Sequence, residues 1–209
     1  MIKIALADNY PIIHYGLEAF FRNDPKIGIV KKVNNYNLIE GVLSSNEIDI
    51  LLIDLDLVGQ SSIMDLKILM SNFPATKTLF FSNYSERIYA SNCIKLGFAG
   101  YVHKSVKLDF LRESIVKVHK GEIIINESIK RSLHFISKQS KSDRPYRKLS
   151  NREIEVLRHL SDGKKNNEIA AIIGINEKTV STYRLRLQIK LNVTNLLDLV
   201  NKAKTLDIA

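Results

Sequence analysis

The stretch Ile50-Leu51-Leu52-Ile53-Asp54 decides the fold of the first half of the chain. Its four apolar residues follow one another without polar alternation, which is typical of a strand buried on both faces of a parallel sheet. An acidic residue ends the run. The earlier apolar stretch from Ile2 to Ala7 ends in the same way, at Asp8. Two carboxylates therefore follow two predicted strands.

Short β-branched runs alternate with segments of helical period through the first 120 residues. Strands are predicted at residues 2–7, 27–33, 50–54, 78–82 and 100–102, and helices at residues 11–22, 36–44, 62–72, 86–96 and 107–120. Five β/α units in this order predict an α/β domain, with a five-stranded parallel sheet covered by helices on both faces. Ligands of such folds gather beyond the carboxyl ends of the strands.

The β/α pattern ends after Gly121. Residues 137–148 are polar and basic and include Pro145, as expected of a connector. Beyond them the sequence is helical without strands. We predict a domain at residues 1–123, a linker at residues 124–148 and an all-α domain of four helices at residues 149–209.

The first helix of the second domain has a well-specified start. Ser150 and Glu153 have the spacing of a capping box, and Leu149 and Ile154 that of a hydrophobic staple. Three more helices are predicted at about residues 167–173, 177–191 and 194–204, with Asn176 as the N-cap of the longest and Gly163 and Gly174 ending the first two.

The excess positive charge lies in the second domain. Residues 1–125 hold 14 Lys and Arg against 13 Asp and Glu, whereas residues 126–209 hold 17 against 9. A basic domain favours a polyanionic partner such as nucleic acid or an anionic membrane, and the alternative from charge alone is a basic surface that serves only solubility. The single Cys93 excludes an internal disulfide, and apolar runs stay shorter than the roughly 18 residues of a membrane span. We expect a cytoplasmic protein without a membrane partner.

Four chemically active residues follow strands of the first domain: Asp8, Asp54, Ser82 and Lys104. Carboxylates crowded at one sheet edge repel each other, and Mg²⁺ relieves that repulsion. A lysine and a hydroxyl can hold the oxygens of a phosphoryl group. This set predicts a site where Asp54 attacks phosphorus. Taken one at a time, each of these residues is more commonly a turn or helix cap, or a solvent-exposed residue at the end of a strand.

The first 123 residues resemble a bacterial response-regulator receiver domain. The resemblance is carried by Asp8-Asn9, Leu52-Ile53-Asp54-Leu55-Asp56, Ser82 and Gly100-Tyr101-Val102-His103-Lys104. It implies a flavodoxin-like (CheY-like) fold and phosphorylation of Asp54 by a sensor histidine kinase. It also implies a Mg²⁺ site formed by Asp8, Asn9, Asp54 and the Asp56 carbonyl, and a switch formed by Ser82 and Tyr101.

Two departures from the receiver pattern concern the acidic pocket. Asn9 replaces the second acid of the usual pair, which removes one negative charge and predicts weaker Mg²⁺ binding. Val58 stands where the family usually has proline. A degenerate receiver, which would make the protein a transcription factor independent of phosphorylation, therefore stays an alternative.

The second domain resembles a LuxR-type helix-turn-helix over residues 149–205. The matching segments are Leu149 to Leu157, Asn167-Glu168-Ile169-Ala170, Glu177 to Tyr183 and Lys190-Leu191. With the receiver, they make the chain resemble the NarL/FixJ family of response regulators, and residues 178–183 look closest to the BvgA/EvgA branch. Lys165 departs from the pattern, because a Ser or Thr cap usually stands there.

The resemblance implies that residues 177–191 are the recognition helix and that residues 194–203 help to pair two copies. A homodimer would read a pseudo-palindromic operator in double-stranded DNA. RNA polymerase is a further candidate partner. The residues expected to contact DNA are Lys165, Asn166, Lys178, Thr179, Ser181, Thr182, Tyr183, Arg184, Arg186 and Lys190.

An enzyme of α/β type, such as a phosphatase, is the alternative of another class. The chain has neither a Gly-rich phosphate loop nor a dinucleotide fingerprint. Its five histidines, at positions 14, 103, 119, 134 and 159, have no metal-ligand spacing. We therefore disfavour an enzyme.

Overall fold

The computed structural model describes residues 1–60, 63–125, 149–206 and 208. The chain divides into two compact units, residues 1–130 and 131–209, which are described separately. Most of the predicted linker, residues 126–148, lies outside the described residues. Among the helices of the described ranges, none has the length and apolarity needed to cross a membrane.

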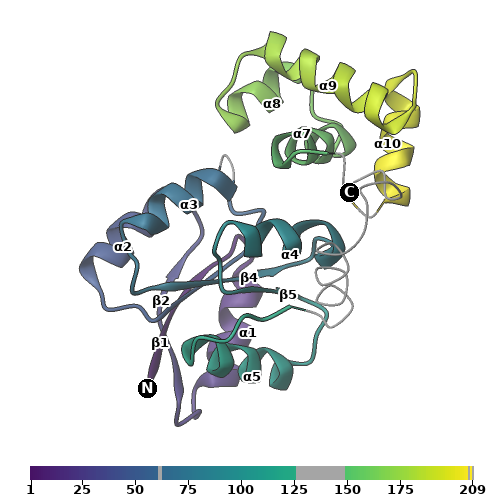
Figure 1. The fold of residues 1–209 in the computed structure, drawn as a ribbon. Helices are drawn as coiled ribbons and strands as arrows, with labels where there is room; N and C mark the ends of the chain where they lie inside the picture. Colours follow the sequence, from purple (N-terminus) through teal and green to yellow (C-terminus); the bar gives the residue numbers. More distant parts are fainter. Residues whose placement is uncertain (61–62, 126–148, 207, 209) are drawn as a thin grey trace. The chain divides into compact units, whose positions relative to one another are not determined.

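The first unit contains a parallel sheet of five strands in the order β2-β1-β3-β4-β5 (Figure 1). The strands are β1 (Ile2–Ala7), β2 (Ile27–Val33), β3 (Ile50–Ile53), β4 (Lys77–Ser82) and β5 (Gly100–His103). This confirms the predicted fold. Strands β1 and β3 are neighbours, with Ala7 paired to Ile53. The residues that follow them, Asp8 and Asp54, therefore leave the sheet side by side.

Helices cover both faces of this sheet, with α1 and α5 on one face and α2, α3 and α4 on the other (Figure 1). Their bounds are α1 (Pro11–Phe21), α2 (Ile39–Ser45), α3 (Ile63–Ser71), α4 (Glu86–Lys95) and α5 (Leu108–His119). The start of the second predicted helix was wrong. The predicted helix at residues 36–44 is a 3₁₀ turn, Tyr36–Leu38, followed by α2. The Asn35 side chain accepts from the Asn37 N–H and caps that separate turn.

The central strands form the core. All four residues of β3 are inaccessible to solvent, as their uninterrupted apolar sequence predicts. On the α1–α5 face, residues of β1 pack with Leu17 and Phe21 of α1 and with Leu111 and Ile115 of α5. Burial of these side chains holds the strand ends, and hence the polar residues that follow them, in fixed positions.

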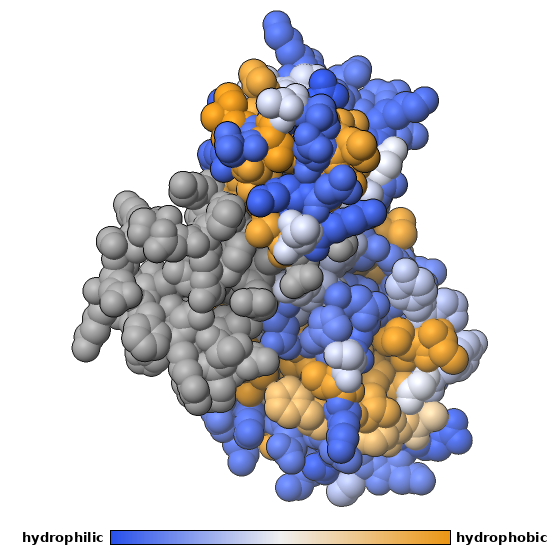
Figure 2. Space-filling view, turned by 90° about the vertical axis from the view of Figure 1, so that its right-hand side faces the viewer, coloured by the Kyte–Doolittle hydropathy of each residue, from blue (hydrophilic) through white to orange (hydrophobic). Residues whose placement is uncertain are grey.

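Apolar side chains also gather on the outside of the first unit, over α1 and α5 (Figure 2). Ile12 and Tyr15 of α1 are 74% and 66% exposed, and Phe110 of α5 is 47% exposed. Arg112 of α5 forms an ion pair with Asp24, in the loop that follows α1, at 2.5 Å.

The second unit contains four described helices, as predicted: α7 (Asn151–Ser161), α8 (Asn166–Ile173), α9 (Glu177–Leu191) and α10 (Leu196–Thr205). The Ser150–Glu153 capping box is present, and Gly163 and Gly174 have the positive φ of helix ends. Helix α10 starts two residues later than predicted, because Asn195 caps it by accepting from the Asp198 N–H at 2.8 Å. Apolar residues from all four helices form one core, among them Leu157, Ile169, Val180, Leu187 and Leu199.

Candidate acidic pocket and nucleic-acid interface

Four residues predicted to lie together meet at the carboxyl end of the sheet. The Ser82 hydroxyl donates to Asp54 Oδ1 at 2.5 Å. The Lys104 ammonium pairs with Asp54 Oδ2 and lies 2.6 Å from Asp8 Oδ2. The two carboxylates are buried, with Asp8 inaccessible and Asp54 3% exposed. Their predicted juxtaposition is confirmed.

The charges of this pocket are arranged around Lys104. Burial by itself would lower the pKa of Lys104, but its hydrogen bonds and charge interactions with Asp54 and Asp8 raise that pKa above the usual value. The lysine is therefore a cation at neutral pH. Two carboxylates and one ammonium leave a single net negative charge.

The remaining carboxylate oxygens are bound to main-chain N–H groups. Asp8 Oδ1 accepts from the Tyr10 N–H at 2.8 Å, and Asp54 Oδ1 accepts from the Asp56 N–H at 3.3 Å in addition to Ser82. Three of the four carboxylate oxygens thus accept hydrogen bonds within the protein, whereas the buried Asp8 Oδ2 lies at ion-pair distance from Lys104 without a hydrogen bond. The Asp54 carboxylate is consequently held in one orientation by groups at or just beyond the ends of β3, β4 and β5.

The predicted metal ligands are oxygen donors, as Mg²⁺ requires. Asp8, Asp54 and the carbonyl of Asp56 lie at the same edge. Over the described ranges, no three His, Cys, Asp or Glu side chains form a metal-binding group, so an ion here would need main-chain oxygen and water as well. The Asp56 carbonyl accepts from Asn9 Nδ2 at 2.5 Å, and Asn9 Oδ1 accepts from the Val58 N–H at 2.8 Å.

Tyr101, the predicted switch residue, points into the domain. Its side chain is 1% exposed, and its hydroxyl donates to the Tyr84 carbonyl at 2.8 Å. The ring stacks on Phe80, with centroids 6.3 Å apart. Burial raises the pKa of Tyr101 well above its ordinary value, so the hydroxyl stays a donor. It links β5 to the loop after Ser82.

Two neighbours of the pocket, Tyr10 and His103, were not predicted from the sequence. The Tyr10 ring lies 5.4 Å from Lys104 Nζ, where its π face attracts the ammonium. His103 bonds Asn83 and Ser105 through its two ring nitrogens, at 2.9 and 2.6 Å. Tyr10 follows Asn9 in the sequence, and His103 precedes Lys104. This adjacency to predicted site residues was the only feature of the sequence that could have pointed to them.

The second unit presents polar residues along the start of α9. Asn176 caps the helix, as predicted, by accepting from the Lys178 N–H at 2.7 Å. Asn166, at the start of α8, donates to Ser181 at 3.1 Å and so fixes the angle between the two helices. Most of the expected DNA contacts are exposed, namely Lys165, Lys178, Thr179, Thr182, Arg186 and Lys190, whereas Asn166, Ser181, Tyr183 and Arg184 are half-buried.

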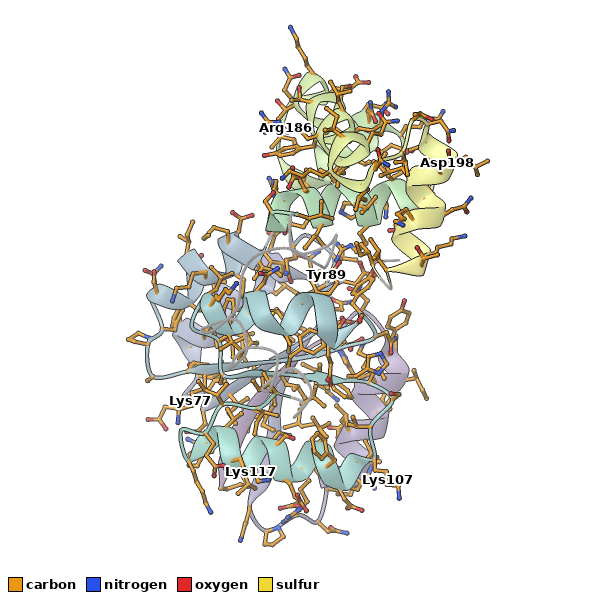
Figure 3. All side chains as sticks on the ribbon, turned by 45° about the vertical axis from the view of Figure 1, so that its right-hand side comes forward. Lys77, Tyr89, Lys107, Lys117, Arg186 and Asp198 are labelled. Atoms are coloured by element: carbon orange, nitrogen blue, oxygen red, sulfur yellow. The ribbon has the colours of Figure 1, made fainter. Side chains whose placement is uncertain are left out.

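Arg186 and Lys190 have partners within this unit. The Arg186 guanidinium lies 5.9 Å from the Tyr183 ring, and Figure 3 labels it on α9. Lys190 reaches Glu153 of α7, Nζ to Oε2 2.8 Å. The sequence analysis placed Lys190 among the DNA contacts and did not foresee this pairing. At Lys165 no side chain caps α8; the Glu168 carboxylate accepts its N–H at 2.6 Å instead.

The outer face of α9 changes character along its length. Lys178 and Thr182 stand in the first half, and Leu185 and Ile189 follow at helical spacing, 58% and 71% exposed. The sequence analysis considered only the buried stripe and the polar residues and missed this apolar pair. In helix-turn-helix domains the first half of the recognition helix reaches the bases.

Comparison with known protein families gives two matches. The response regulator receiver domain matches residues 4–116, and the LuxR family of bacterial regulatory proteins matches residues 147–203. Together they cover both units. The ranges agree with the folds described above, an α/β domain followed by a helical one.

Several full-length proteins are similar to this chain. The Fimbriae Z protein of Escherichia coli K12 is 28% identical over 208 residues, covering 99% of this chain and 98% of that protein. The oxygen regulatory protein NreC of Staphylococcus carnosus is 26% identical over 216 residues, covering 99% and 100%.

The RcsB response regulator of Salmonella typhimurium has the same fold, with a TM-score of 0.81 at 23% identity, over 99% of this chain and 98% of that one. A structure of Salmonella RcsB bound to the promoter rprA in the presence of the phosphomimetic BeF₃⁻ has a TM-score of 0.76 at 24% identity, covering 96% and 97%. Placement nearest the BvgA/EvgA branch stays a prediction. The chain belongs to the NarL/FixJ family of response regulators, in which a receiver domain is joined to a LuxR-type DNA-binding domain.

Proposed function

We propose that a sensor histidine kinase phosphorylates Asp54 and that this modification controls binding of α9 to an operator. The family is one of DNA-binding two-component regulators. The observation that carries the proposal is the contact of one buried carboxylate, Asp54, with both Ser82 and Lys104. These are the groups that phosphoryl transfer to a carboxylate needs.

In the proposed transfer, an Asp54 oxygen forms a bond to phosphorus while the phosphorus–nitrogen bond of the kinase phosphohistidine breaks. The departing imidazole takes a proton from solvent. Lys104 and Ser82, already hydrogen-bonded to Asp54, move their donors to the new phosphoryl oxygens. Mg²⁺, held by Asp8, Asp54 and the Asp56 carbonyl, would supply positive charge that neutralises those oxygens.

The signal would leave the pocket through Ser82 and Tyr101. Ser82 stands at the end of β4, and the Tyr101 hydroxyl holds the Tyr84 carbonyl two residues further on. A shift of Ser82 toward a phosphoryl oxygen would move the same loop that Tyr101 contacts. Such a coupling biases a two-state equilibrium between resting and active receivers.

The start of α9 is the proposed base-reading surface. Lys178, Thr179 and Thr182 are exposed there, beyond the Asn176 cap. Four half-buried residues would position the helix or contact the sugar-phosphate backbone: Asn166, Ser181, Tyr183 and Arg184. Additional phosphate contacts would come from Lys165 and Arg186. Lys190 is the exception, because its ion pair with Glu153 makes it a brace between α7 and α9.

We propose that two copies read two half-sites. RcsB, a protein of the same fold, has been described as dimers bound to DNA. Two exposed apolar surfaces of this chain could pair copies: the α1–α5 surface, which contains Ile12, Tyr15 and Phe110, and the start of α10, where Leu197 is 70% exposed. RNA polymerase is a further proposed partner, and chromosomal DNA as target implies action in the cytoplasm.

The experiment is selection of bound DNA from a random pool, with and without beryllofluoride and Mg²⁺. We expect a pseudo-palindromic site with tighter binding in the presence of the phosphoryl analogue. The matched control is Asp54→Ala, which should bind the same site without responding. An equal response in wild type and Asp54→Ala would contradict control through Asp54.

The second candidate function, regulation without phosphorylation, is favoured by Asn9, which reduces the charge of the pocket by one. Asp54→Ala cells that retain full regulation of the selected operator would support it. A phosphatase activity is not favoured, because the family is one of transcription regulators. Turnover of a generic phosphomonoester would reopen that possibility.

A further inference from the structure

Asn9 ties the end of β1 to the loop that follows β3. Its amide nitrogen donates to the Asp56 carbonyl at 2.5 Å, and its amide oxygen accepts from the Val58 N–H at 2.8 Å. The Val58 carbonyl in turn accepts from the Tyr36 N–H at 2.8 Å. The loop is therefore held from the β1 side and from the β2 side. We call the two hydrogen bonds of Asn9 the Asn9 clip.

The partners of Asn9 determine which way its amide faces. The Asp56 carbonyl can only accept a hydrogen bond, and the Val58 N–H can only donate one. Turning the amide by half a revolution would place oxygen against the carbonyl and the NH₂ group against the N–H. The Asn9 oxygen therefore already accepts one hydrogen bond, and a cation bound to it would compete with the Val58 N–H for the same oxygen.

The clip occupies a group expected to bind the metal ion. The Asp56 carbonyl is the one main-chain ligand in the expected set, and the Asn9 NH₂ group already covers it. The partly positive NH₂ group is hydrogen-bonded to that carbonyl oxygen and would repel a cation that bound the same oxygen. The two carboxylates are similarly engaged, since Lys104 contacts one oxygen of Asp8 and one of Asp54.

We infer that Asn9 is a positioning residue that hinders the binding of divalent cations to the Asp56 carbonyl, rather than a ligand of Mg²⁺. The inference rests on the proposed function, because the receiver chemistry is what places Mg²⁺ in this pocket. The expected weak binding of Mg²⁺ then has two separable causes: the missing carboxylate at position 9 and the amide donor that a cation would meet at the Asp56 carbonyl.

Replacement by alanine distinguishes a ligand from a clip, because the two roles predict opposite results. If Asn9 binds the cation, Asn9→Ala weakens Mg²⁺ binding. If Asn9 hinders cation binding at the carbonyl, Asn9→Ala removes that hindrance without changing the charge of the pocket and tightens Mg²⁺ binding. We expect the Mg²⁺ Kd to fall about fivefold, which corresponds to one net hydrogen bond.

The experiment titrates MgCl₂ into the EDTA-treated full chain, without a phosphoryl donor, by calorimetry and by tyrosine fluorescence. Asn9→Asp serves as the positive control, because its added carboxylate should tighten binding more than tenfold. An unchanged or weakened Kd in Asn9→Ala would overturn the inference. Absence of binding in all three proteins would overturn it too, since opening the clip would then free no usable ligand.

A second pair of variants tests the clip from its other side. Val58→Pro removes the N–H that binds Asn9 Oδ1 and alters no side chain of the pocket, and Val58 is 57% exposed. We expect this variant to tighten Mg²⁺ binding about twofold to threefold, whereas Val58→Ala, which keeps the N–H, should match wild type. An unchanged Kd in Val58→Pro contradicts the clip even if Asn9→Ala fails to fold.

These titrations are independent of phosphorylation. If DNA binding does not respond to beryllofluoride but the Mg²⁺ Kd values have the expected order, the proposed phosphorylation switch is contradicted and the role of the clip is supported. If DNA binding responds to beryllofluoride but Asn9→Ala leaves the Mg²⁺ Kd unchanged, the switch is supported and the role of the clip is contradicted.

Discussion

Lys190, near the end of α9, forms an ion pair with Glu153, in the first turn of α7, with Nζ 2.8 Å from Oε2. The Glu153 side chain is 3% exposed and also accepts from the Ser150 N–H at 2.6 Å. One carboxylate therefore closes the capping box of α7 and anchors α9. The orientation of the proposed recognition helix depends on this pair.

Removing the lysine should destabilise the second unit. In Lys190→Met the aliphatic stem remains, but the buried Glu153 loses its cationic partner, and we expect unfolding to become easier by about 1–2 kcal/mol. Hydrogen exchange of the α7 and α9 amides in the full chain measures the effect. Wild-type protection in Lys190→Met would show that the pair is not a brace.

Lys178 provides the contrasting case. It is exposed on the first half of α9, so Lys178→Met should leave hydrogen exchange unchanged. It should weaken binding to all DNA sequences about tenfold and reduce the slope of log affinity against log salt by about 1, because one phosphate contact is lost. A defect confined to one operator base would instead assign Lys178 to base recognition.

Acid should weaken the same contact. Burial alone would raise the pKa of Glu153, but the hydrogen bonds from Lys190 and Ser150 lower it below 4.5. A carboxylate with a lowered folded-state pKa stabilises the protein above its unfolded-state pKa, and this contribution is lost as the pH falls through the folded-state value.

We therefore expect the second unit of wild type to lose stability below about pH 4.5 more steeply than that of Glu153→Gln, which carries no titrating group at this position. Hydrogen exchange corrected for intrinsic rates, measured from pH 6 to pH 3, gives both slopes. Parallel curves for the two proteins would contradict the assignment.

The acidic pocket makes a different prediction. The Lys104 side chain is only 5% exposed and contacts both Asp8 and Asp54, so Lys104→Met leaves two buried carboxylates without their shared cation. We expect a loss of about 3 kcal/mol in EDTA, measured by urea unfolding. Because the variant frees two carboxylate oxygens, Mg²⁺ should stabilise it more than it stabilises wild type.

Lys117→Met is the matched control, since Lys117 is exposed on α5 (Figure 3). It should unfold like wild type, with and without Mg²⁺. If Lys104→Met proves as stable as wild type in EDTA, the carboxylates do not depend on the lysine, and the arrangement of charges described above is wrong.

The sequence predicted the strands and the pocket because both depend on local patterns. The apolar run ending at Asp54 specifies a buried strand, and the position of the acid after that strand specifies the edge where it lies. The same reasoning located Ser82 and Lys104. The capping residues Ser150 and Asn176 were found because a helix end is satisfied by residues within one turn of it.

Pairings between distant segments could not be predicted in the same way. Glu153 and Lys190 are 37 residues apart, and no local pattern distinguishes a lysine that braces two helices from one that contacts phosphate. Asn9 was predicted as a weak metal ligand that replaces an acid, and its hydrogen bonds were not foreseen, because its partners Asp56 and Val58 become neighbours only when β1 pairs with β3. The direction of a hydrogen bond needs the position of both partners.

Gly100 illustrates a constraint that backbone contact imposes on the first unit. A Cβ at this position would lie 2.5 Å from the Ile124 carbonyl oxygen, because residue 124 pairs with the start of β5 through a parallel bridge. We expect Gly100→Ala to destabilise the chain by about 2–3 kcal/mol, because the Ile124 carbonyl oxygen is a main-chain atom that would have to move. Moving it would break the hydrogen bond that it accepts from the Tyr101 N–H at 2.9 Å.

Gly16→Ala is the control. Nothing lies within 4 Å of a Cβ at this position in the interior of α1, so the substitution should stabilise the chain by about 0.5–1 kcal/mol. Urea unfolding that moves both variants in the same direction would contradict the close approach at Gly100.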